Sequence, residues 1–329
     1  MLANPLPPLG CAVIAHQWPL SLSPRGVLAF VAQSVNPDSL SLHTGIFFRW
    51  EDIQSVAADS RKILVNRKVF VHTDSPRYAR LLAKLLQRLA KLPDSERELA
   101  VKRAVNESLN AEAVQQRFQE FRPGSHRLRH RCNLLFIVLF LLAPALVWRF
   151  GLNRVGLACL MGVIGLVVLI AMEFLQQHKR LFPGEKSDRA APLVTMFLAP
   201  PAAIRAWDAL ARQLIVEFHP LAVARILCPP DEFRRFARRI LLDLWHPIAP
   251  GCPFDGLEPQ AVEAWFRKNL IEATEAMLRQ AKLNLEELTQ APVRAEESHS
   301  YCPRCDSQFV SERGICADCG GVPLRRFEQ

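Results

Sequence analysis

The sequence lacks the short motifs that identify many enzymes. It contains no glycine-rich phosphate-binding loop, no GxSxG nucleophile motif and no HExxH metal motif. The Met1–Gly10 segment is rich in proline and has no basic region, which disfavours a secretory signal peptide. Two stretches in the middle of the chain lack charge almost completely, and they give the clearest indication of where the protein resides.

The uncharged stretches are Cys132–Trp148 and Val155–Phe174, and only Arg149–Arg154 separates them. Glu173 is the one charged residue within either run. About 17–25 apolar residues are enough for a helix to cross the ~30 Å hydrocarbon core of a bilayer. Both runs are apolar on every face, which favours a membrane over the alternative of a buried helical hairpin in a soluble protein. We predict a two-helix transmembrane hairpin at 132–174.

Basic residues flank the hairpin more densely than they fill its loop, where only Arg149 and Arg154 occur. Lys and Arg near span ends favour the cytoplasmic side of the membrane. We therefore expect two spans in a bacterial inner (plasma) membrane, with both termini cytoplasmic. The flanking residues are Arg117, Arg122, Arg127, Arg129 and Arg131 before the first span, and Lys179, Arg180, Lys186 and Arg189 after the second.

Neither span has an ionisable residue at the depth of the bilayer centre, which argues against a transporter. Pro144 is expected to kink the first span. Ala158, Gly162 and Gly165 are small, and we expect them to let the first helix approach closely or to support a homo-oligomer. The hairpin is therefore interpreted as an anchor.

The chain has a net charge of +9, much of it beside the spans in residues 122–131. Anionic headgroups attract such segments by about 1 kcal/mol per basic residue. We expect Arg122, Arg127, Arg129 and Arg131 to contact anionic lipid. Nucleic acid is the second, less favoured, interpretation of the charge.

Residues 1–92 are predicted to form a small β-rich domain closed by a helix. Asp74-Ser75-Pro76 has the form of a helix start, and leucines follow it at helical spacing. Within Ile46–Val65, an apolar strand is followed by Trp50-Glu51-Asp52-Ile53 and then by a second strand. This order resembles bacterial pleckstrin-homology-like domains, which implies a small barrel capped by the helix. An unrelated α+β domain is the alternative. The predicted strands are Cys11–Trp18, Val27–Ser34, Thr44–Trp50, Arg61–Val65 and Lys68–His72.

Residues 93–131 are predicted to form a helical stalk that ends in the basic juxtamembrane segment. Ser95 and Glu98 have the spacing of a capping box. Apolar residues at helical intervals from Leu99 to Phe118 give the stalk one narrow apolar stripe.

Residues 190–289 are expected to form a cytosolic all-α domain. Its first segment, Ala191–Ile204, is apolar and broken by prolines, so it suits either the membrane surface or the protein core. The form R-x-L-[IL]-x-x-[FW]-H-P-[LI]-A occurs twice, ending near His219 and His246. These histidines could cap the last carbonyls of their helices. The expected helices are Ala203–Phe218, Pro230–Trp245, Glu258–Ala281 and Leu283–Leu288.

The segment Glu232–Pro247, a loop and Ala261–Gln280 together resemble a J-domain. Arg234, Arg235, Arg238 and Arg239 match the basic helix of that family, and Trp245-His246-Pro247 matches the start of its signature. Ile248 stands where the family has aspartate, so the resemblance implies a J-like fold without the usual co-chaperone activity. Two helices packed through apolar stripes are the alternative.

After a polar linker at 290–299, the tail contains the strongest chemical motif of the chain. Cys302, Cys305, Cys316 and Cys319 form a CxxC…CxxC pattern with ten residues between the pairs. Two such knuckles can direct four thiolates at one tetrahedral metal ion. The pattern resembles a zinc ribbon over residues 300–326. Four thiolates leave no open coordination position, so we expect a structural zinc; iron, a disulfide or a redox pair are the alternatives.

We therefore expect an α+β multidomain membrane protein. It would contain a small N-terminal β-rich domain with a closing helix, a two-helix transmembrane hairpin, a cytosolic all-α domain and a C-terminal zinc ribbon. The favoured function is a membrane-anchored cytoplasmic adaptor or scaffold that docks protein partners through the helices and the ribbon, without catalysis. A J-like co-chaperone and a membrane enzyme using His219 or His246 in residues 190–290 are the alternatives.

Overall fold

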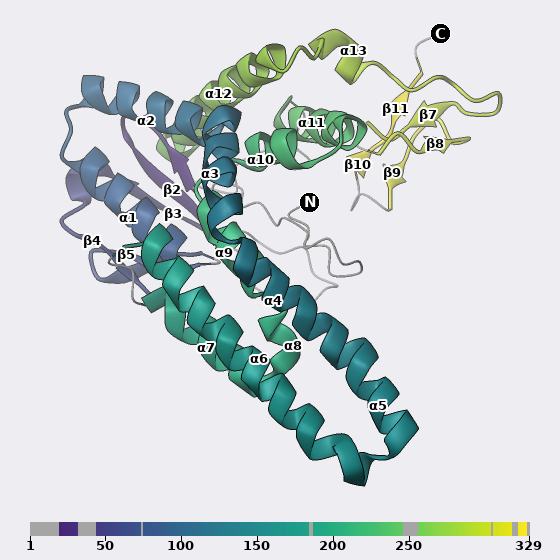
Figure 1. The fold of residues 1–329 in the computed structure, drawn as a ribbon. Coiled ribbons are helices and arrows are strands. Elements are labelled where there is room, and N and C mark those ends of the chain that lie inside the picture. Colours follow the sequence, from purple (N-terminus) through teal and green to yellow (C-terminus); the bar gives the residue numbers. More distant parts are fainter. Residues whose placement is uncertain are drawn as a thin grey trace.

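A helical hairpin extends from a mixed body of sheets and helices, and a small β-rich module lies at the C-terminal end (Figure 1). This arrangement comes from a computed structural model of the protein. The structure describes residues 20–31, 44–73, 75–183, 187–245, 256–303, 305–317 and 322–327.

The N-terminal part contains two three-stranded antiparallel sheets, in the orders β1-β2-β3 and β4-β5-β6. Within the described residues no strand pairing joins the two sheets, so the expected small barrel is not closed there. Strands β1 and β4 were not expected, and the predicted strand Cys11–Trp18 lies outside the described residues. The strands are β1 (Leu20–Leu22), β2 (Gly26–Val31), β3 (Thr44–Arg49), β4 (Val56–Asp59), β5 (Lys62–Val65) and β6 (Lys68–His72).

Helix α1 (Pro76–Ala90) packs against β4 and β5 and forms the closing helix of this part. It begins as predicted: the Ser75 hydroxyl accepts a hydrogen bond from the Tyr78 amide at 3.0 Å, and Pro76 occupies the first turn. Its inner face buries Leu82, Leu86 and Leu89, so burial of this leucine face stabilises the helix on the sheet.

The predicted stalk consists of two helices, α2 (Asp94–Ser108) and α3 (Ala111–Gly124). The capping box predicted at Ser95 is wrong, because α2 already begins at Asp94 and Pro93 precedes it without a side-chain cap. Asp94 instead pairs with Arg97 at the start of the helix.

The hairpin is longer than its apolar runs. Its first arm covers His126–Phe150 and its second arm, α6, covers Leu152–Leu181. Only Gly151 lies between them, and its φ of +83° suits a residue without a side chain. Both arms are long and apolar enough to cross a membrane, and only 6% and 22% of their most apolar windows are buried within the protein. The first arm comprises α4 (His126–Ile137), a π-helical turn (Val138–Leu142) and α5 (Ala143–Phe150).

The irregular turn in the first arm ends at Leu142, two residues before Pro144. Proline cannot donate its backbone hydrogen bond, and a π-helical turn is one local way of accommodating that loss. The expected role of Gly162 and Gly165 in packing the two arms together is wrong. A Cβ added at either glycine would meet nothing within 4 Å, so neither glycine contacts the first arm.

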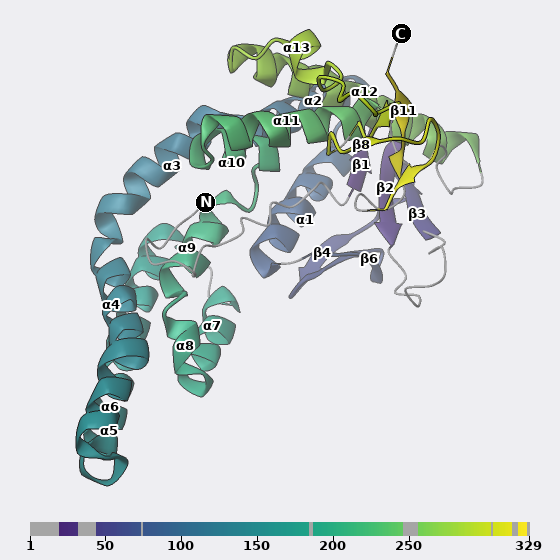
Figure 2. The same cartoon turned by 90° about the vertical axis from the view of Figure 1, so that its right-hand side faces the viewer.

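The region after the hairpin is helical as expected, but its segmentation is finer. Helix α11 matches its predicted bounds, whereas α10 was missed because it lies in the interval between the first two predicted helices, which was interpreted as a loop. Figure 2 shows α7, α8 and α9 beside the hairpin, apart from α11 and α12. The helices are α7 (Ser187–Leu198), α8 (Pro200–Ala203), α9 (Ala206–Ile215), α10 (Pro220–Leu227), α11 (Pro230–Trp245), α12 (Leu257–Gln280) and α13 (Leu285–Thr289).

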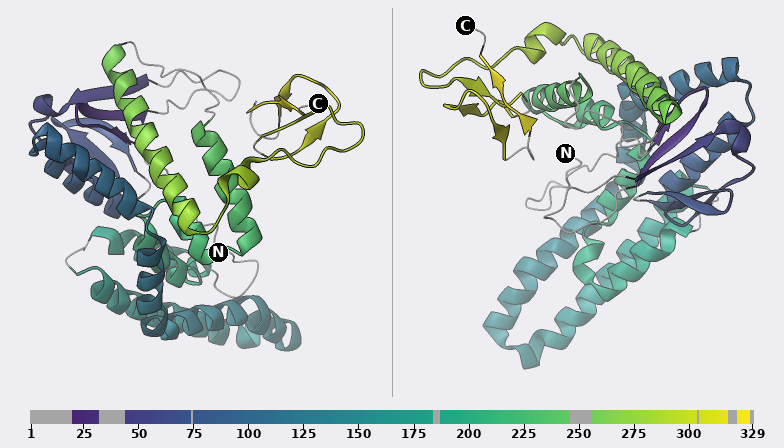
Figure 3. Two further views of the ribbon diagram at one scale, coloured as in Figure 1. Left: turned by 90° about the horizontal axis from the view of Figure 1, so that it is seen from above. Right: turned by 180° about the vertical axis from the view of Figure 1, so that it is seen from behind.

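Helix α12 connects the C-terminal helices to the N-terminal sheet, as the view from above shows (Figure 3). Val262 of α12 packs with Leu28 and Phe47 of the sheet. At the edge of this contact, the Arg49 guanidinium donates to both carboxylate oxygens of Glu258, at 2.7 and 2.9 Å. Residues more than 200 positions apart in the sequence therefore form one packed body.

Candidate metal centre

The C-terminal module is built from five two-residue strands in two small sheets, β11-β7-β8 and β10-β9. Cys302 follows β7 directly, and Cys316 is the last residue of β9. The module has only a minimal apolar core, formed by its cysteines with Val322, Phe309 and Leu324. The strands are β7 (Ser300–Tyr301), β8 (Gln308–Phe309), β9 (Ile315–Cys316), β10 (Val322–Pro323) and β11 (Arg325–Arg326).

Three of the four predicted ligands converge. The sulfur atoms of Cys302, Cys305 and Cys316 all lie within 4.8 Å of one another, and this is the only such group of metal-ligating side chains in the described part of the chain. Cys302 and Cys316 are fully buried, whereas Cys305 is exposed. The fourth predicted ligand, Cys319, lies outside the described residues.

A tight turn places the first two cysteines on one side of the cluster. The Cys302 amide donates to the Ser307 carbonyl at 2.8 Å, and the Asp306 amide donates back to the Cys302 carbonyl at 3.0 Å. Asp306 takes a positive φ of 62° to close the turn. Such a turn directs both sulfur atoms of a CxxC pair to the same point, where they can hold a metal ion.

The three described cysteines of the module, Cys302, Cys305 and Cys316, are not linked to one another by disulfides. The Cys305 and Cys316 sulfur atoms are 3.8 Å apart, whereas a disulfide requires about 2.05 Å. Thiolate sulfur is a soft ligand that suits zinc, copper(I) or iron. The three converging side chains could therefore bind a metal ion.

An ion pair attaches this turn to the helical body. The Arg238 guanidinium on α11 donates to Asp306 Oδ2 at 2.8 Å, and its second Nη atom lies 2.7 Å from Oδ1. Partial burial raises the pKa of the Asp306 carboxyl, and the charge of Arg238 opposes that rise. Sequence reasoning had placed Arg238 only in the basic face of α11, and nothing in the sequence pairs it with Asp306.

The four arginines expected to contact anionic lipid occupy different environments. Arg122 and Arg127 are exposed. The guanidinium of Arg129 lies over the Trp207 ring, at 5.6 Å from its centre. Arg131 pairs with Glu173 of α6 at 3.0 Å, so its charge is balanced within the hairpin. Arg122 and Arg127 are therefore more accessible at the protein surface than Arg129 and Arg131.

His219, one of the two histidines considered for catalysis, caps a helix. Its ring Nδ1 accepts a hydrogen bond from the Leu221 amide at the start of α10, so it caps a helix start and not the predicted helix end. Its own amide donates to the Ser108 carbonyl at 2.8 Å. Burial lowers the pKa of His219 to about 4, which keeps it neutral near pH 7. His246, with Pro247 and Ile248 of the J-like signature, lies outside the described residues.

Comparisons with protein-family models, with curated proteins and with solved structures gave no match.

Proposed function

We propose that the protein is a membrane-anchored adaptor whose hairpin spans the bilayer and whose metal-stabilised C-terminal module docks a protein partner. The module would be a structural zinc ribbon completed by Cys319. Both termini would lie on the cytoplasmic side of a bacterial inner membrane, because the denser basic flanks lie there.

The observation that carries the membrane anchor is an exposed apolar surface between two charged ends of the hairpin. The Arg131–Glu173 pair marks one end, and Arg149 and Arg154 mark the other. At 1.5 Å per residue, positions 131 to 149 and 154 to 173 rise by about 27 and 29 Å. These lengths match a hydrocarbon core of ~30 Å.

Many apolar side chains between these charged ends are exposed on the outer surface of the hairpin, and their exposure to water would be unfavourable. They include Leu141 and Leu157, which are 60% and 74% exposed. At the far end, Trp148 is 89% exposed beside Arg149, in the position typical of an interfacial aromatic residue. A helix pair with this surface requires an apolar environment, which lipid provides.

The size and core of the C-terminal module support a structural metal. A segment of this length buries too little apolar surface to fold alone, so a metal held by thiolates would supply folding energy. Val310 and Ile315 are exposed on its surface, at 66% and 65%. These two apolar side chains are the contact surface that we assign to the protein partner.

The test is crosslinking and capture of the full-length protein from native membranes, comparing three variants. Cys302→Ser should abolish both metal binding and partner capture, because the module loses its fold. Ile315→Asp should keep the metal and lose the partner, because only the surface changes. Leu257→Asp, at a residue that is 85% exposed on α12, is the matched surface control and should change neither.

All three variants should remain in the membrane fraction after alkaline extraction. Partner capture that survives both Cys302→Ser and Ile315→Asp would show that the module is not the docking element. A wild-type protein that captures no partner would contradict the adaptor function itself.

A further inference from the structure

An uncharged segment directly after the hairpin has an exposed apolar surface of its own. Residues 190–204 contain no charged side chain and lie between Arg189 and Arg205. Helix α7 buries Met196 against the body but exposes Phe197 and Leu198, at 54% and 82%. A helix that is apolar on both faces needs an apolar environment on its outer side as well.

Helices α7 and α8 lie at the depth of the spans rather than above them. The Cys132 thiol in the first arm donates to the Ala203 carbonyl at the end of α8, at 3.4 Å. The neighbouring residue Arg131 forms the charged end of the hairpin with Glu173. In Figure 2, α7 and α8 extend from α9 in the direction of the hairpin tip. The α7–α8 turn therefore lies beyond the charged end, on the apolar side.

The start of α7 lies beside the end of α6, on the side of the charged end that faces the body. The Arg189 side chain donates to the His178 ring near the end of α6, at 3.1 Å. Both α7 and α8 also contact α6 along their course. The chain thus leaves α6, turns back beside it and returns through α9, on one side of the hairpin (Figure 1).

The backbone of this turn suits an environment without water. A helix start normally leaves several N–H groups without partners, and each such group is strongly unfavourable in hydrocarbon. At the start of α8, Pro200 and Pro201 have no N–H group to satisfy. The next amide, Ala202, donates to the Ala199 carbonyl at 2.7 Å, and the Ala199 amide donates to Thr195 at 2.9 Å.

We propose that α7 and α8 form a re-entrant segment that inserts into the half of the bilayer nearest the body and contacts lipid acyl chains through Val194, Phe197 and Leu198. This inference rests on the proposed function, because the hairpin must span the membrane for the segment to lie in lipid. The occupant of this surface is the acyl-chain region of the membrane, continuous with that around the spans.

The test places one environment-sensitive fluorescent amino acid in the full-length protein, which is reconstituted in bilayers containing lipids with a quencher on the acyl chain. Position 198 is the test site. Position 257, also a leucine and 85% exposed, is the matched control on α12. Position 141, a leucine that is 60% exposed in the first arm, reports insertion of the hairpin.

The proposal predicts that emission from position 198 is lost to a similar degree as emission from position 141, while emission from position 257 is unchanged. Quenching at 141 without quenching at 198 would overturn the re-entrant segment and leave the membrane anchor intact. Absence of quenching at both 141 and 198 would overturn the anchor and, with it, this inference.

Discussion

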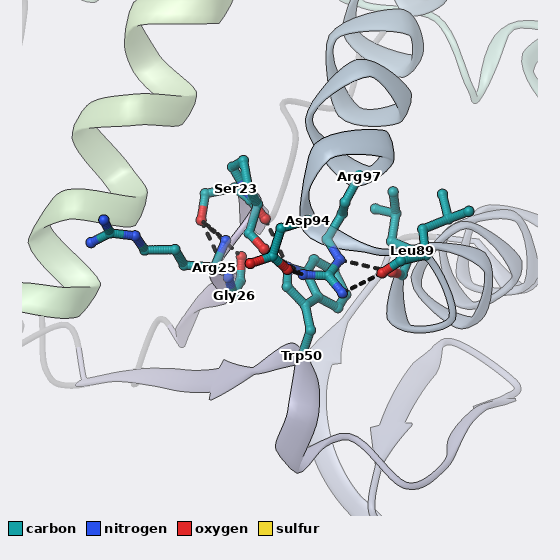
Figure 4. Close-up of polar contacts among 9 residues, drawn as sticks. Ser23, Arg25, Gly26, Trp50, Leu89, Asp94 and Arg97 are labelled. Atoms are coloured by element: carbon teal, nitrogen blue, oxygen red, sulfur yellow. Dashed lines mark hydrogen bonds and ion pairs between the residues drawn. The ribbon is translucent and has the colours of Figure 1, made fainter.

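The guanidinium of Arg97 lies over the indole ring of Trp50, with its carbon 5.4 Å from the ring centre (Figure 4). Arg97 is only 7% exposed, so its N–H donors need partners within the protein. They donate hydrogen bonds to the carbonyls of Pro24, Leu89 and Leu92 and to the Asp94 carboxylate. The Trp50 ring N–H donates to the Ser23 carbonyl at 2.7 Å. Two adjacent side chains thus join the β1–β2 turn, the end of α1 and the start of α2.

Arg97→Lys is expected to destabilise the protein by about 2–3 kcal/mol. A lysine has no planar fork, so buried carbonyls would lose their donors. The measurement is thermal unfolding of the purified protein in detergent. Arg103→Lys, on the exposed face of the same helix, should change the free energy of unfolding by less than about 0.5 kcal/mol. Equal effects of the two substitutions would contradict the role of Arg97 as a buried link.

Cys316→Ser should abolish the metal binding that we propose for the C-terminal module. The Cys316 sulfur is buried beside two other thiols, and a serine hydroxyl is a poor ligand for the soft metals that bind them. Metal analysis of the purified protein measures the effect directly, with about one zinc per chain expected for wild type. Cys228→Ser is the control, because Cys228 lies outside the cluster, and it should retain the metal. A wild-type protein that binds no zinc would contradict the assignment.

Arg238→Ala should loosen the metal module from the helical body without unfolding it. Arg238 is the α11 residue that pairs with Asp306 in the turn between Cys305 and Ser307. We expect a cost of about 1 kcal/mol, since the pair is only partly buried. Hydrogen exchange should increase in residues 300–309 while metal content stays constant. Arg239→Ala, at the neighbouring exposed position, should leave hydrogen exchange unchanged. Unchanged exchange in Arg238→Ala as well would show that the Arg238–Asp306 ion pair does not hold the module to the body.

Acidification should destabilise the body through His219. Its pKa is about 4 in the folded protein and 6.5 ordinarily, so the unfolded chain binds the proton more tightly. The contribution of neutral His219 to the free energy of unfolding is complete above pH 6.5. It is lost as the pH falls to 4, by up to about 3 kcal/mol. His219→Asn should keep the helix cap and flatten this pH dependence in thermal unfolding. His72→Asn, at an exposed position, should not flatten it.

Local signals in the sequence predicted the elements that depend on local chemistry. Ser75-Pro76 gave the start of α1, and the apolar runs gave the two arms of the hairpin. The CxxC spacing predicted that Cys302, Cys305 and Cys316 converge, and their sulfur atoms do lie close together. Each of these features follows from neighbouring residues whose chemistry restricts the backbone.

Contacts between residues far apart in the sequence could not be predicted from these local signals. The docking of α12 on β2 joins positions more than 200 residues apart, and the apolar packing and the Arg49–Glu258 ion pair that accompany it form only in the folded protein. Helix α10 was missed because His219-Pro220 was interpreted only as a helix end. Proline is equally suited to the first position of a new helix, which is the role that it has here.

The central claim is that the hairpin anchors the body to one side of a membrane. The most direct measurement inserts a protease site at Gly151 and a second one at the C-terminus, and compares sealed bacterial spheroplasts, whose outer membrane and cell wall have been removed, with permeabilised spheroplasts. We expect cleavage at Gly151 in sealed spheroplasts and at the C-terminus only after permeabilisation, with the protein resisting alkaline extraction. Release by alkali, or cleavage at both sites only after permeabilisation, would contradict a membrane-spanning hairpin.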